Sequence, residues 1–270
     1  MREDTEKRAA AAVWGDVREC GTEPSCFSAG ELRIYVRFVD SEVHVAHEYA
    51  AGEAGAPGRA TVEPSAWSRW VLKGETSGVR LQPSFPDRAV VVKPDTPFRL
   101  PKGAQTKIFV RVPVWVKVLL DGEKETLLTT VPAAVLSNTW FGSFEEGEPC
   151  YWLSSGFRRH ASADASRPDL VVCPLRIYNR SSDEFSVEKI CLRLDNYSLF
   201  YDGSQLWSDE IRILYKGPEN ISQVKVVGKP PEESPGAVLV SGPKKEIRKS
   251  FAAKTFSSLK ELSGLGFSGG

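Results

Sequence analysis

Most of the chain between residues 32 and 240 alternates apolar and polar positions, which is the pattern of β-strands whose two faces meet different surroundings. The clearest run, Lys107–Leu119, is rich in valine and aromatic residues, as long strands are. Pro113 lies in its middle and cannot donate a backbone hydrogen bond, so we expect a sheet edge or a bulge there. The Asp121-Gly122 pair predicts a turn. Thr126–Leu136 then returns as the second strand of a β-hairpin.

Shorter alternating runs precede this hairpin. Leu32–Val39 and Val43–Tyr49 are predicted to pair across a turn at Asp40-Ser41, and Ala89–Val92 is predicted to be a further strand. Ser65–Val71 differs, because its two tryptophans have helical spacing after a serine that can cap a helix. The pattern there predicts a short helix.

A second set of strands begins at Val171–Tyr178, followed by a turn over Asn179–Glu184 and a returning strand over Phe185–Leu194. Within the returning strand the apolar positions switch from odd to even numbers, which predicts a β-bulge near Glu188 or Lys189. Further short strands are expected at Ser198–Tyr201, Gln205–Trp207, Ile211–Tyr215, Gln223–Val227 and Ala237–Val240.

The pattern changes to a helical period over Lys244–Leu262. Apolar residues there occupy about half of a helical wheel, and most of the lysines and arginines lie elsewhere on it. We expect an amphipathic helix that packs its apolar face on the rest of the chain. Docking on a partner or on an anionic membrane is the alternative, because this segment is locally basic.

These patterns predict an all-β protein with two antiparallel β-sandwich-like units and a C-terminal amphipathic helix. The polar stretch Ser162–Pro168 is the expected linker between the two units, although the units could share one core. The expected parts are an N-terminal segment (1–31), a first β-sandwich unit (32–160), a second, smaller, immunoglobulin-like unit (168–242), and the basic helix with a Gly/Ser tail (244–270).

Composition narrows the function classes. The 270 residues carry 35 Lys+Arg and 35 Asp+Glu, so no overall positive field would draw the protein to nucleic acid. The charged start, Met1–Arg8, lacks the apolar stretch of a secretory signal, and the most apolar window, Ile108–Leu120, is interrupted by charges and a proline. Five cysteines, an odd number, indicate reduced thiols, and we expect a cytoplasmic protein.

Metal and cofactor signals are weak, and we expect neither. His44 and His47 are three residues apart and would point to opposite faces of a strand. Cys20 and Cys26 have no neighbouring histidine or cysteine pair. The tail sequence 264–269 matches a dinucleotide fingerprint in letters only, because no strand precedes it and no helix can follow it.

The expected hairpin after Val171 would place Cys173 opposite Cys191 if its register is undisturbed. Two opposed thiols could form a redox-sensitive crosslink. The alternative is that both are buried, reduced cysteines, which are common in protein cores.

Ser137–Leu153 is the segment with most candidate chemistry, because aromatic and acidic residues are concentrated in it. Aromatic faces can stack on a sugar or fill a partner's pocket, and a desolvated glutamate can act as a general acid or base. The alternative is that the aromatics fill the protein's own core and the glutamates form a solvated turn. The candidate binding residues are Trp140, Phe141, Tyr151, Trp152 and Arg159, and the weaker catalytic candidates are Glu145, Glu148 and Arg158.

Four runs of the sequence resemble an uncharacterised archaeal and bacterial family defined only as a domain of unknown function. The resemblance spans roughly Leu32 to Val227, and it implies no activity, cofactor or catalytic residue. The runs are Leu136–Gly142 (LSNTWFG), Glu148–Trp152 (EPCYW), Cys173–Ser181 (CPLRIYNRS) and Leu206–Glu210 (LWSDE).

These observations favour a non-catalytic, cytoplasmic interaction module that engages a protein or carbohydrate through the aromatic and acidic loop near Trp140–Trp152. The second hypothesis is a glycoside-type hydrolase with a carboxylate at Glu145 or Glu148. The third is a membrane-peripheral accessory protein that docks through residues 244–262.

Overall fold

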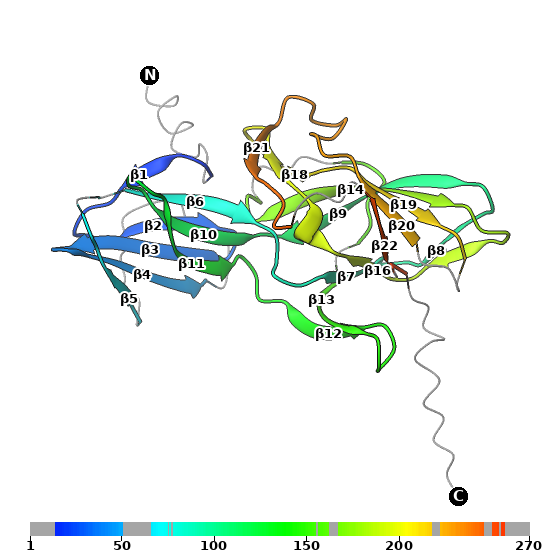
Figure 1. Ribbon diagram of the computed structural model, residues 1–270, viewed down its shortest axis with the longest axis horizontal. Helices are drawn as coiled ribbons and strands as arrows, with labels where there is room; N and C mark the ends of the chain where they lie inside the picture. The colour runs from blue at the N-terminus through cyan, green and yellow to red at the C-terminus, as the bar shows by residue number, and fades with distance from the viewer. Residues whose placement is uncertain are drawn as a thin grey trace, which may run out of the picture.

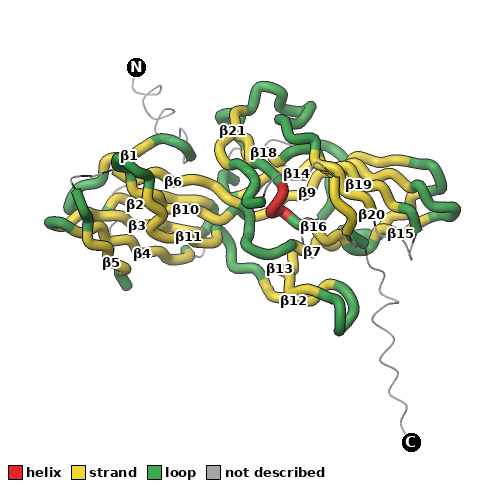
Figure 2. The backbone as a smooth tube through the Cα atoms, viewed as in Figure 1, coloured by secondary structure: helices red, strands yellow, loops and turns green. Residues whose placement is uncertain are grey.

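The computed structural model describes residues 14–50, 66–74, 76, 78–154, 156–161, 167–217, 222–245, 250–253 and 255–256. Strands dominate these residues, and the helical element among them is a single short 3-10 turn, η1 (Leu194–Asn196). Figure 2 shows this turn in red among the yellow strands. The all-β expectation is therefore confirmed.

The molecule is elongated, with two groups of sheets lying along its long axis (Figure 1). The group at the left of Figure 1 consists of two four-stranded sheets. The first has the order β1 (Val17–Glu19), β6 (Gly78–Ser84), β10 (Trp115–Leu120), β11 (Thr126–Pro132), and the second has the order β2 (Ser25–Ala29), β3 (Leu32–Val39), β4 (Glu42–Tyr49), β5 (Ser68–Val71).

The predicted hairpins of this group are present. β3 and β4 pair antiparallel from Leu32 opposite Tyr49 to Val39 opposite Glu42, and Asp40 turns the chain with a positive φ of 52°. β10 and β11 pair as predicted, with a register shift between Val118 and Leu119.

The expected short helix over Ser65–Val71 is wrong in its described part. Ser68–Val71 forms β5 and pairs antiparallel with β4, Val71 lying opposite Glu42. The free edge of β4 offers a row of backbone partners, and pairing with it overrides the helical spacing of the tryptophans.

The two left-hand sheets contribute side chains to one core. Ile34 and Val36 of β3 and Val116 and Val118 of β10 are buried in the same hydrophobic cluster. Burial of these aliphatic side chains accounts for the alternation along both hairpins. The sandwich and immunoglobulin-like descriptions stay predictions.

The other group contains three sheets. A four-stranded sheet has the order β12 (Ser137–Phe141), β13 (Glu148–Ser154), β7 (Val90–Lys93), β16 (Ile190–Leu192), and a two-stranded sheet pairs β15 (Phe185–Val187) with β8 (Phe98–Leu100). The eight-stranded sheet has the order β21 (Val238–Ser241), β17 (Leu199–Tyr201), β18 (Leu206–Ser208), β14 (Leu170–Asn179), β19 (Ile211–Tyr215), β20 (Ser222–Val226), β22 (Ser250–Ala253), with β9 (Gln105–Pro113) also on β14.

β14 is the central strand of the large sheet, and most of its residues are buried. It pairs antiparallel with β9 on one side, and parallel with β18 and then β19 on the other. Pro174 lies where the parallel partner changes, between the residues that pair with β18 and those that pair with β19. A central strand tolerates a proline there because no parallel partner needs its missing N–H.

The expected long strand Lys107–Leu119 is divided between the two ends of the molecule. β9 ends at Pro113, and β10 begins at Trp115 in a different sheet. Val114 makes the crossing and donates its N–H to the carbonyl of Asp169 at 2.8 Å. Pro113 thus ends an edge strand, as one of the two expectations for this residue required.

The expected hairpin between Val171–Tyr178 and Phe185–Leu194 is wrong. β15 pairs with β8, and β16 pairs with β7, so neither strand pairs with β14. The change of apolar parity near Glu188 marks the point at which the chain passes from one sheet to another. A strand that changes sheets shows the same sequence signal as a bulged strand.

Backbone pairing crosses the expected linker. β9 pairs with β14 along nine residues, and β7 pairs with β16, so strands from both sides of Ser162–Pro168 share sheets. One hydrophobic cluster also contains Val116 from the left-hand sheets and Leu175 from β14. These contacts fit the alternative in which the two expected units share one core.

The expected C-terminal helix is absent from the described residues of Lys244–Leu262. Ser250–Ala253 form β22 and pair antiparallel with β20 at the edge of the large sheet. Phe256 packs edge to face on Phe185 and Tyr215. Pairing with an open sheet edge satisfies backbone groups and outweighs the helical pattern of the side chains. The rest of the expected helix lies outside the described residues.

Candidate functional site

The aromatic and acidic segment forms a hairpin, β12–β13, that projects from the molecule at the bottom of Figure 1. Its strands pair antiparallel from Ser137 opposite Trp152 to Phe141 opposite Glu148. β13 also pairs in parallel with β7, whereas β12 is the edge strand of the sheet. The hairpin is therefore anchored along one strand and free along the other.

Ser143 organises the tip of this hairpin. Its carbonyl accepts hydrogen bonds from Trp140 Nε1 and from the Gly147 N–H, both at 2.8 Å, and its hydroxyl accepts one from the Glu146 N–H at 3.1 Å. Gly142 has a φ of +110°, which glycine adopts without strain. Three hydrogen bonds thus hold the tip in one conformation.

The apex of the tip is an exposed phenylalanine. Phe144 is 95% exposed, the largest exposed fraction among the large hydrophobic residues of the described chain, and Trp140 is 52% exposed. Glu145 and Glu146 follow Phe144 and are also exposed. The tip combines a bulky apolar group with two adjacent carboxylates.

The other predicted binding residues of the hairpin have structural contacts. Phe141 is buried in a small cluster with Val91. Tyr151 donates its hydroxyl to Asp87 at 2.9 Å, and Trp152 packs partly buried against the Phe141 cluster. These three aromatics make contacts within the protein, which fit the alternative that aromatics of this segment fill the protein's own core.

The candidate catalytic residues are not gathered in one cleft. Glu145 is exposed at the hairpin tip, and Glu148 Oε1 forms an ion pair at 2.5 Å with Arg193. Arg158 lies on a different segment, where its backbone exchanges two hydrogen bonds with Phe109 of β9. Nothing in this arrangement pairs two carboxylates across a substrate space, as glycoside hydrolysis requires.

Arg159 lines a pocket of about 310 Å³ beside β9. Asp95, Phe98 and Phe157 also line it, and the two phenylalanine rings meet edge to face at 6.1 Å. None of the hairpin residues lines this pocket. The structure therefore separates Arg159 from the other predicted binding residues.

A second cluster lies at the base of the hairpin, where Glu148 and Cys150 of β13 meet Cys191 of β16. One carboxylate oxygen and the two Sγ atoms all lie within 4.8 Å of one another. Cys150 is 0% exposed and Cys191 is 3% exposed. We call these three residues the thiol–carboxylate cluster.

The two thiols of this cluster share a hydrogen bond. It lowers the pKa of Cys150 and, together with burial, raises the pKa of Cys191 well above its ordinary value. The positive charge of Arg193 acts to lower the pKa of both thiols.

This cluster was not predicted from the sequence. Glu148 and Cys150 are two residues apart on a strand, so their common face could have been read from the alternation. Cys191 carries no such signal, because it comes from a strand 41 residues away that reaches the site by pairing with β7. The expected partner, Cys173, instead lies in the large sheet, where burial raises its pKa to about 12.

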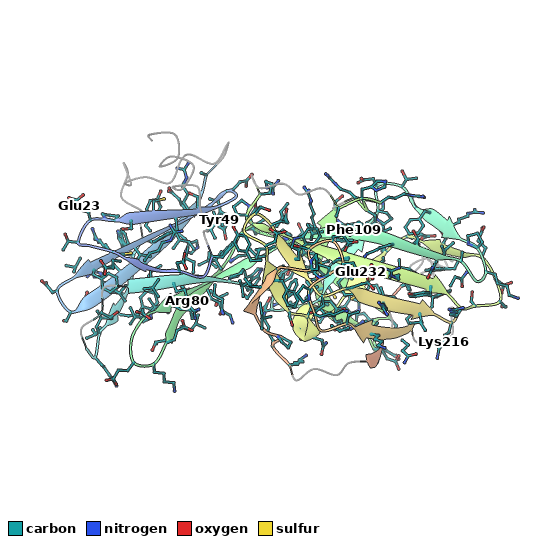
Figure 3. All side chains as sticks on the ribbon, turned by 90° about the horizontal axis from the view of Figure 1, so that it is seen from above. Glu23, Tyr49, Arg80, Phe109, Lys216 and Glu232 are labelled. Carbon is teal, nitrogen blue, oxygen red and sulfur yellow. The ribbon has the colours of Figure 1, made fainter. Side chains whose placement is uncertain are left out.

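A third polar cluster centres on Glu210, which is 3% exposed. Its carboxylate accepts hydrogen bonds from Arg176 Nη2 at 3.1 Å and Arg212 Nε at 2.8 Å, and it pairs with Lys107 Nζ at 3.0 Å. Burial acts to raise its pKa, but the three cations outweigh burial and lower the pKa to about 2. Lys107 also pairs with Glu233. Figure 3 labels Glu232, another partner of Lys107, in this region.

The four sequence runs that carried the family resemblance pair with one another. Leu136–Gly142 and Glu148–Trp152 pair with each other in the hairpin, and Cys173–Ser181 meets Leu206–Glu210 through the bidentate pair of Arg176 with Glu210. The hairpin and the Glu210 cluster are thus the two places where these runs converge.

The architecture defines an all-β protein whose two groups of sheets are joined by the chain passing from β9 to β10 and by one continuous hydrophobic cluster. The chain belongs to the DUF432 family, described as a protein of unknown function, which matches residues 13–260. No curated protein and no solved structure matches the chain. Within the described residues, no helix has the length and apolar character needed to span a membrane.

Proposed function

We propose that this chain is a non-catalytic interaction module that binds a protein partner through the tip of the β12–β13 hairpin. The observation that carries the proposal is Phe144, a large aromatic side chain exposed at the apex of a projecting hairpin. Moving a phenylalanine side chain from water into an apolar pocket gains about 1.5–3 kcal/mol, which is enough to anchor an interface.

The rigidity of the tip supports this function. The three hydrogen bonds to Ser143 hold the turn before any partner arrives. A loop that is already ordered loses less conformational entropy on binding. Trp140 adds a half-exposed aromatic surface beside the apex.

The charges at the tip indicate the chemistry of the partner. Glu145 and Glu146 follow Phe144 directly and are exposed, so we expect an apolar pocket rimmed by lysine or arginine. An anionic membrane would repel the same carboxylates. A carbohydrate would be expected to stack on a flat aromatic face, and Trp140 offers the larger aromatic ring at the tip.

The hydrolase and membrane hypotheses gain no support from the contacts. The catalytic candidates lie on separate segments, as described above. Lys244 donates to the carbonyls of Phe85 and Pro86, and Lys245 pairs with Asp195, so both lysines are tied to the body of the molecule. A cytoplasmic location also belongs to this proposal, and the five free cysteines support it.

Site-specific photo-crosslinking tests the proposal. A photoreactive phenylalanine analogue at position 144, in cells that express the full chain, should give an adduct with one protein species. The same analogue at Leu127, which is exposed on β11, is the matched control and should not give that adduct. An identical adduct pattern at both positions, or none at 144, contradicts the proposal.

Binding measurements with the captured partner then test the role of each group. Phe144→Ala should weaken binding about 30-fold, the loss expected for a hot-spot residue, whereas Leu127→Ala should leave the affinity unchanged. Replacing Glu145 and Glu146 by lysine should slow association and reduce its salt dependence. Retention of a carbohydrate ligand with Phe144→Ala and its loss with Trp140→Ala would favour a carbohydrate partner instead.

A further inference from the structure

The geometry points to a zinc-binding site formed by Glu148, Cys150 and Cys191 at the base of the hairpin. This inference stands apart from the proposed function, because it concerns buried donors and not the exposed tip. The donor atoms come from two strands that flank β7, and they converge within 4.8 Å.

The distances suit a tetrahedral ion. With Zn–S bonds of about 2.3 Å and Zn–O bonds of about 2.1 Å, two ligand atoms in a tetrahedral site lie about 3.6–3.8 Å apart. The donors of the thiol–carboxylate cluster lie at most 4.8 Å apart. Each side chain would therefore need to move by only about 1 Å or less to reach a common ion, a change that small torsional adjustments can supply.

The donor types select the metal. Two thiolates disfavour Mg²⁺ and Ca²⁺, which prefer oxygen ligands throughout. The carboxylate disfavours Cu⁺, which prefers sulfur, and two cysteines are too few for a common iron–sulfur cluster. Zn²⁺ accepts sulfur and oxygen together. Three protein ligands leave its fourth position for water or another ligand.

The Glu148 carboxylate can bind a zinc ion while it remains paired with Arg193. Glu148 Oε1 is buried and accepts no hydrogen bond from the described residues, although Arg193 Nη2 lies 2.5 Å away as an ion-pair partner. A carboxylate oxygen has two lone-pair sites, so contact with Arg193 leaves one for a metal. One oxygen of the same carboxylate lies within 4.8 Å of both thiol sulfurs, where an ion could join the three donors.

The charge of the site is balanced by Arg193. Two thiolates and one carboxylate carry three negative charges, and Zn²⁺ leaves one of them uncompensated. Arg193 is in contact with Glu148 and supplies the missing positive charge. A charged group that holds a metal ligand in this way orients it and tunes its basicity.

The surroundings exclude water from the thiols. Val91 and Phe141 are buried beside the cysteines, and Ala89 and Trp152 pack partly buried against them. An apolar shell strengthens the interaction between a cation and thiolates, because it lowers the local dielectric constant. The half-exposed Glu148 marks the side from which an ion would enter.

Titration of the reduced, metal-free full chain with Co²⁺ and then Zn²⁺ tests the site. Wild type should bind one Co²⁺ with a thiolate-to-cobalt charge-transfer band that Zn²⁺ abolishes, and native mass spectrometry should show one zinc per chain. Cys150→Ala and Cys191→Ala should lose the band. Cys26→Ala is the matched control, because Cys26 is a free cysteine outside the cluster, and it should retain the band.

A milder variant covers the case in which a cysteine variant does not fold. Glu148→Gln keeps both thiols and the shape of the side chain, and it should weaken Zn²⁺ binding at least about 10-fold. The absence of a thiolate band in wild type, its persistence in Cys191→Ala, or unchanged affinity in Glu148→Gln would overturn the inference. The inference would also be overturned if the chain bound no metal under reducing conditions and its mass were lower by two hydrogens, as expected for a Cys150–Cys191 disulfide.

Discussion

Glu210 and Glu148 are both paired glutamates at the same end of the molecule, yet their surroundings differ. Glu210 is buried among Lys107, Arg176 and Arg212, whose cationic groups occupy its oxygens. Glu148 has one cation, Arg193, and two thiols as neighbours, and its buried Oε1 atom accepts no hydrogen bond among the described residues. The difference distinguishes a carboxylate that completes a structural network from one that retains capacity for a ligand.

The two glutamates also differ in where they lie relative to the strands. Glu210 lies in the gap between β18 and β19, beside the central strand β14, where Pro174 lacks a backbone donor. Glu148 lies at the start of β13, where the projecting hairpin joins its sheet. The Glu210 side chain is only 3% exposed, whereas that of Glu148 is 40% exposed. A structural role for Glu210 and a binding role for Glu148 follow from this placement.

The largest expected effect is the loss of the Glu210 carboxylate. Glu210→Ala leaves three cations near one another without their shared counter-charge, and it should lower the free energy of unfolding by about 3–5 kcal/mol. Urea unfolding of the purified chain measures this change. Glu232→Ala, which removes an exposed partner of Lys107 and Arg176, should cost less than about 1 kcal/mol. Equal effects of the two substitutions would contradict the comparison.

The second expected effect is a loss of stability in acid. The pKa of Glu210 is lowered to about 2 in the folded chain, from an ordinary value of 4.5. The unfolded chain therefore binds the proton more tightly, and the contribution of Glu210, about 3 kcal/mol, is complete above pH 4.5 and disappears as the pH falls toward 2. Asp202, whose pKa is also lowered to about 2, adds a slope of the same sign.

A comparison of wild type with Glu210→Gln separates the contribution of Glu210 to acid stability from that of Asp202. The stability difference between wild type and Glu210→Gln, measured by urea unfolding from pH 7 to pH 2, should shrink steadily below pH 4.5. A difference that stays constant over this range would show that Glu210 does not titrate with a lowered pKa.

The third expected effect concerns the thiol–carboxylate cluster. Zinc at 100 times its dissociation constant should stabilise the wild-type chain by about 2.7 kcal/mol, because it binds the folded state. Thermal unfolding with and without zinc measures this shift. Glu148→Gln should reduce the shift in melting temperature at the same zinc concentration. Glu232→Gln, which alters the ion pairs around Glu210 instead, should leave the shift unchanged. A shift of equal size in Glu148→Gln would indicate that zinc binds elsewhere.

The smallest expected effect is at the hairpin tip. A methyl group on Gly147 would lie about 2.5 Å from the Ser143 carbonyl oxygen and would collide with the Trp140 indole. Gly147→Ala should therefore break the bond from Trp140 to Ser143 and cost about 1 kcal/mol, with a change in tryptophan fluorescence. Gly122→Ala, in the open turn between β10 and β11, should change stability by less than about 0.5 kcal/mol. Similar results for both glycines would argue against a rigid tip.

Strand pairing could be predicted from the sequence in some parts of the chain and not in others, and the difference has a physical cause. The β3–β4 and β10–β11 hairpins were predicted closely, because their turns join strands that pair with their neighbours in sequence. Phe185–Leu194 was predicted as one bulged strand, but it forms β15 and β16, whose partners β8 and β7 lie 85 to 102 residues away in the sequence. Local alternation contains no information about such distant partners.

Some features of the candidate site could likewise be predicted from the sequence, and others depend on strand pairing. The hairpin and its aromatic and acidic composition could be predicted from the run Ser137–Leu153, but the exposure of Phe144 and the burial of Phe141 could not. Which aromatic faces solvent depends on how β13 attaches to β7. Cys191 could not be assigned to the site at all, because only the pairing of β16 with β7 brings it there.

The sequence by itself determined that this chain is built of strands, where several of them begin and end, and which segment concentrates aromatic and acidic residues, because alternation and turn residues act locally. The tertiary structure alone decided which strands share a sheet, that Ser250–Ala253 extend the large sheet instead of forming a helix, and that two cysteines and a glutamate meet. Backbone hydrogen-bonding groups are the same in every residue, so the choice of partner strand depends on how the whole core packs.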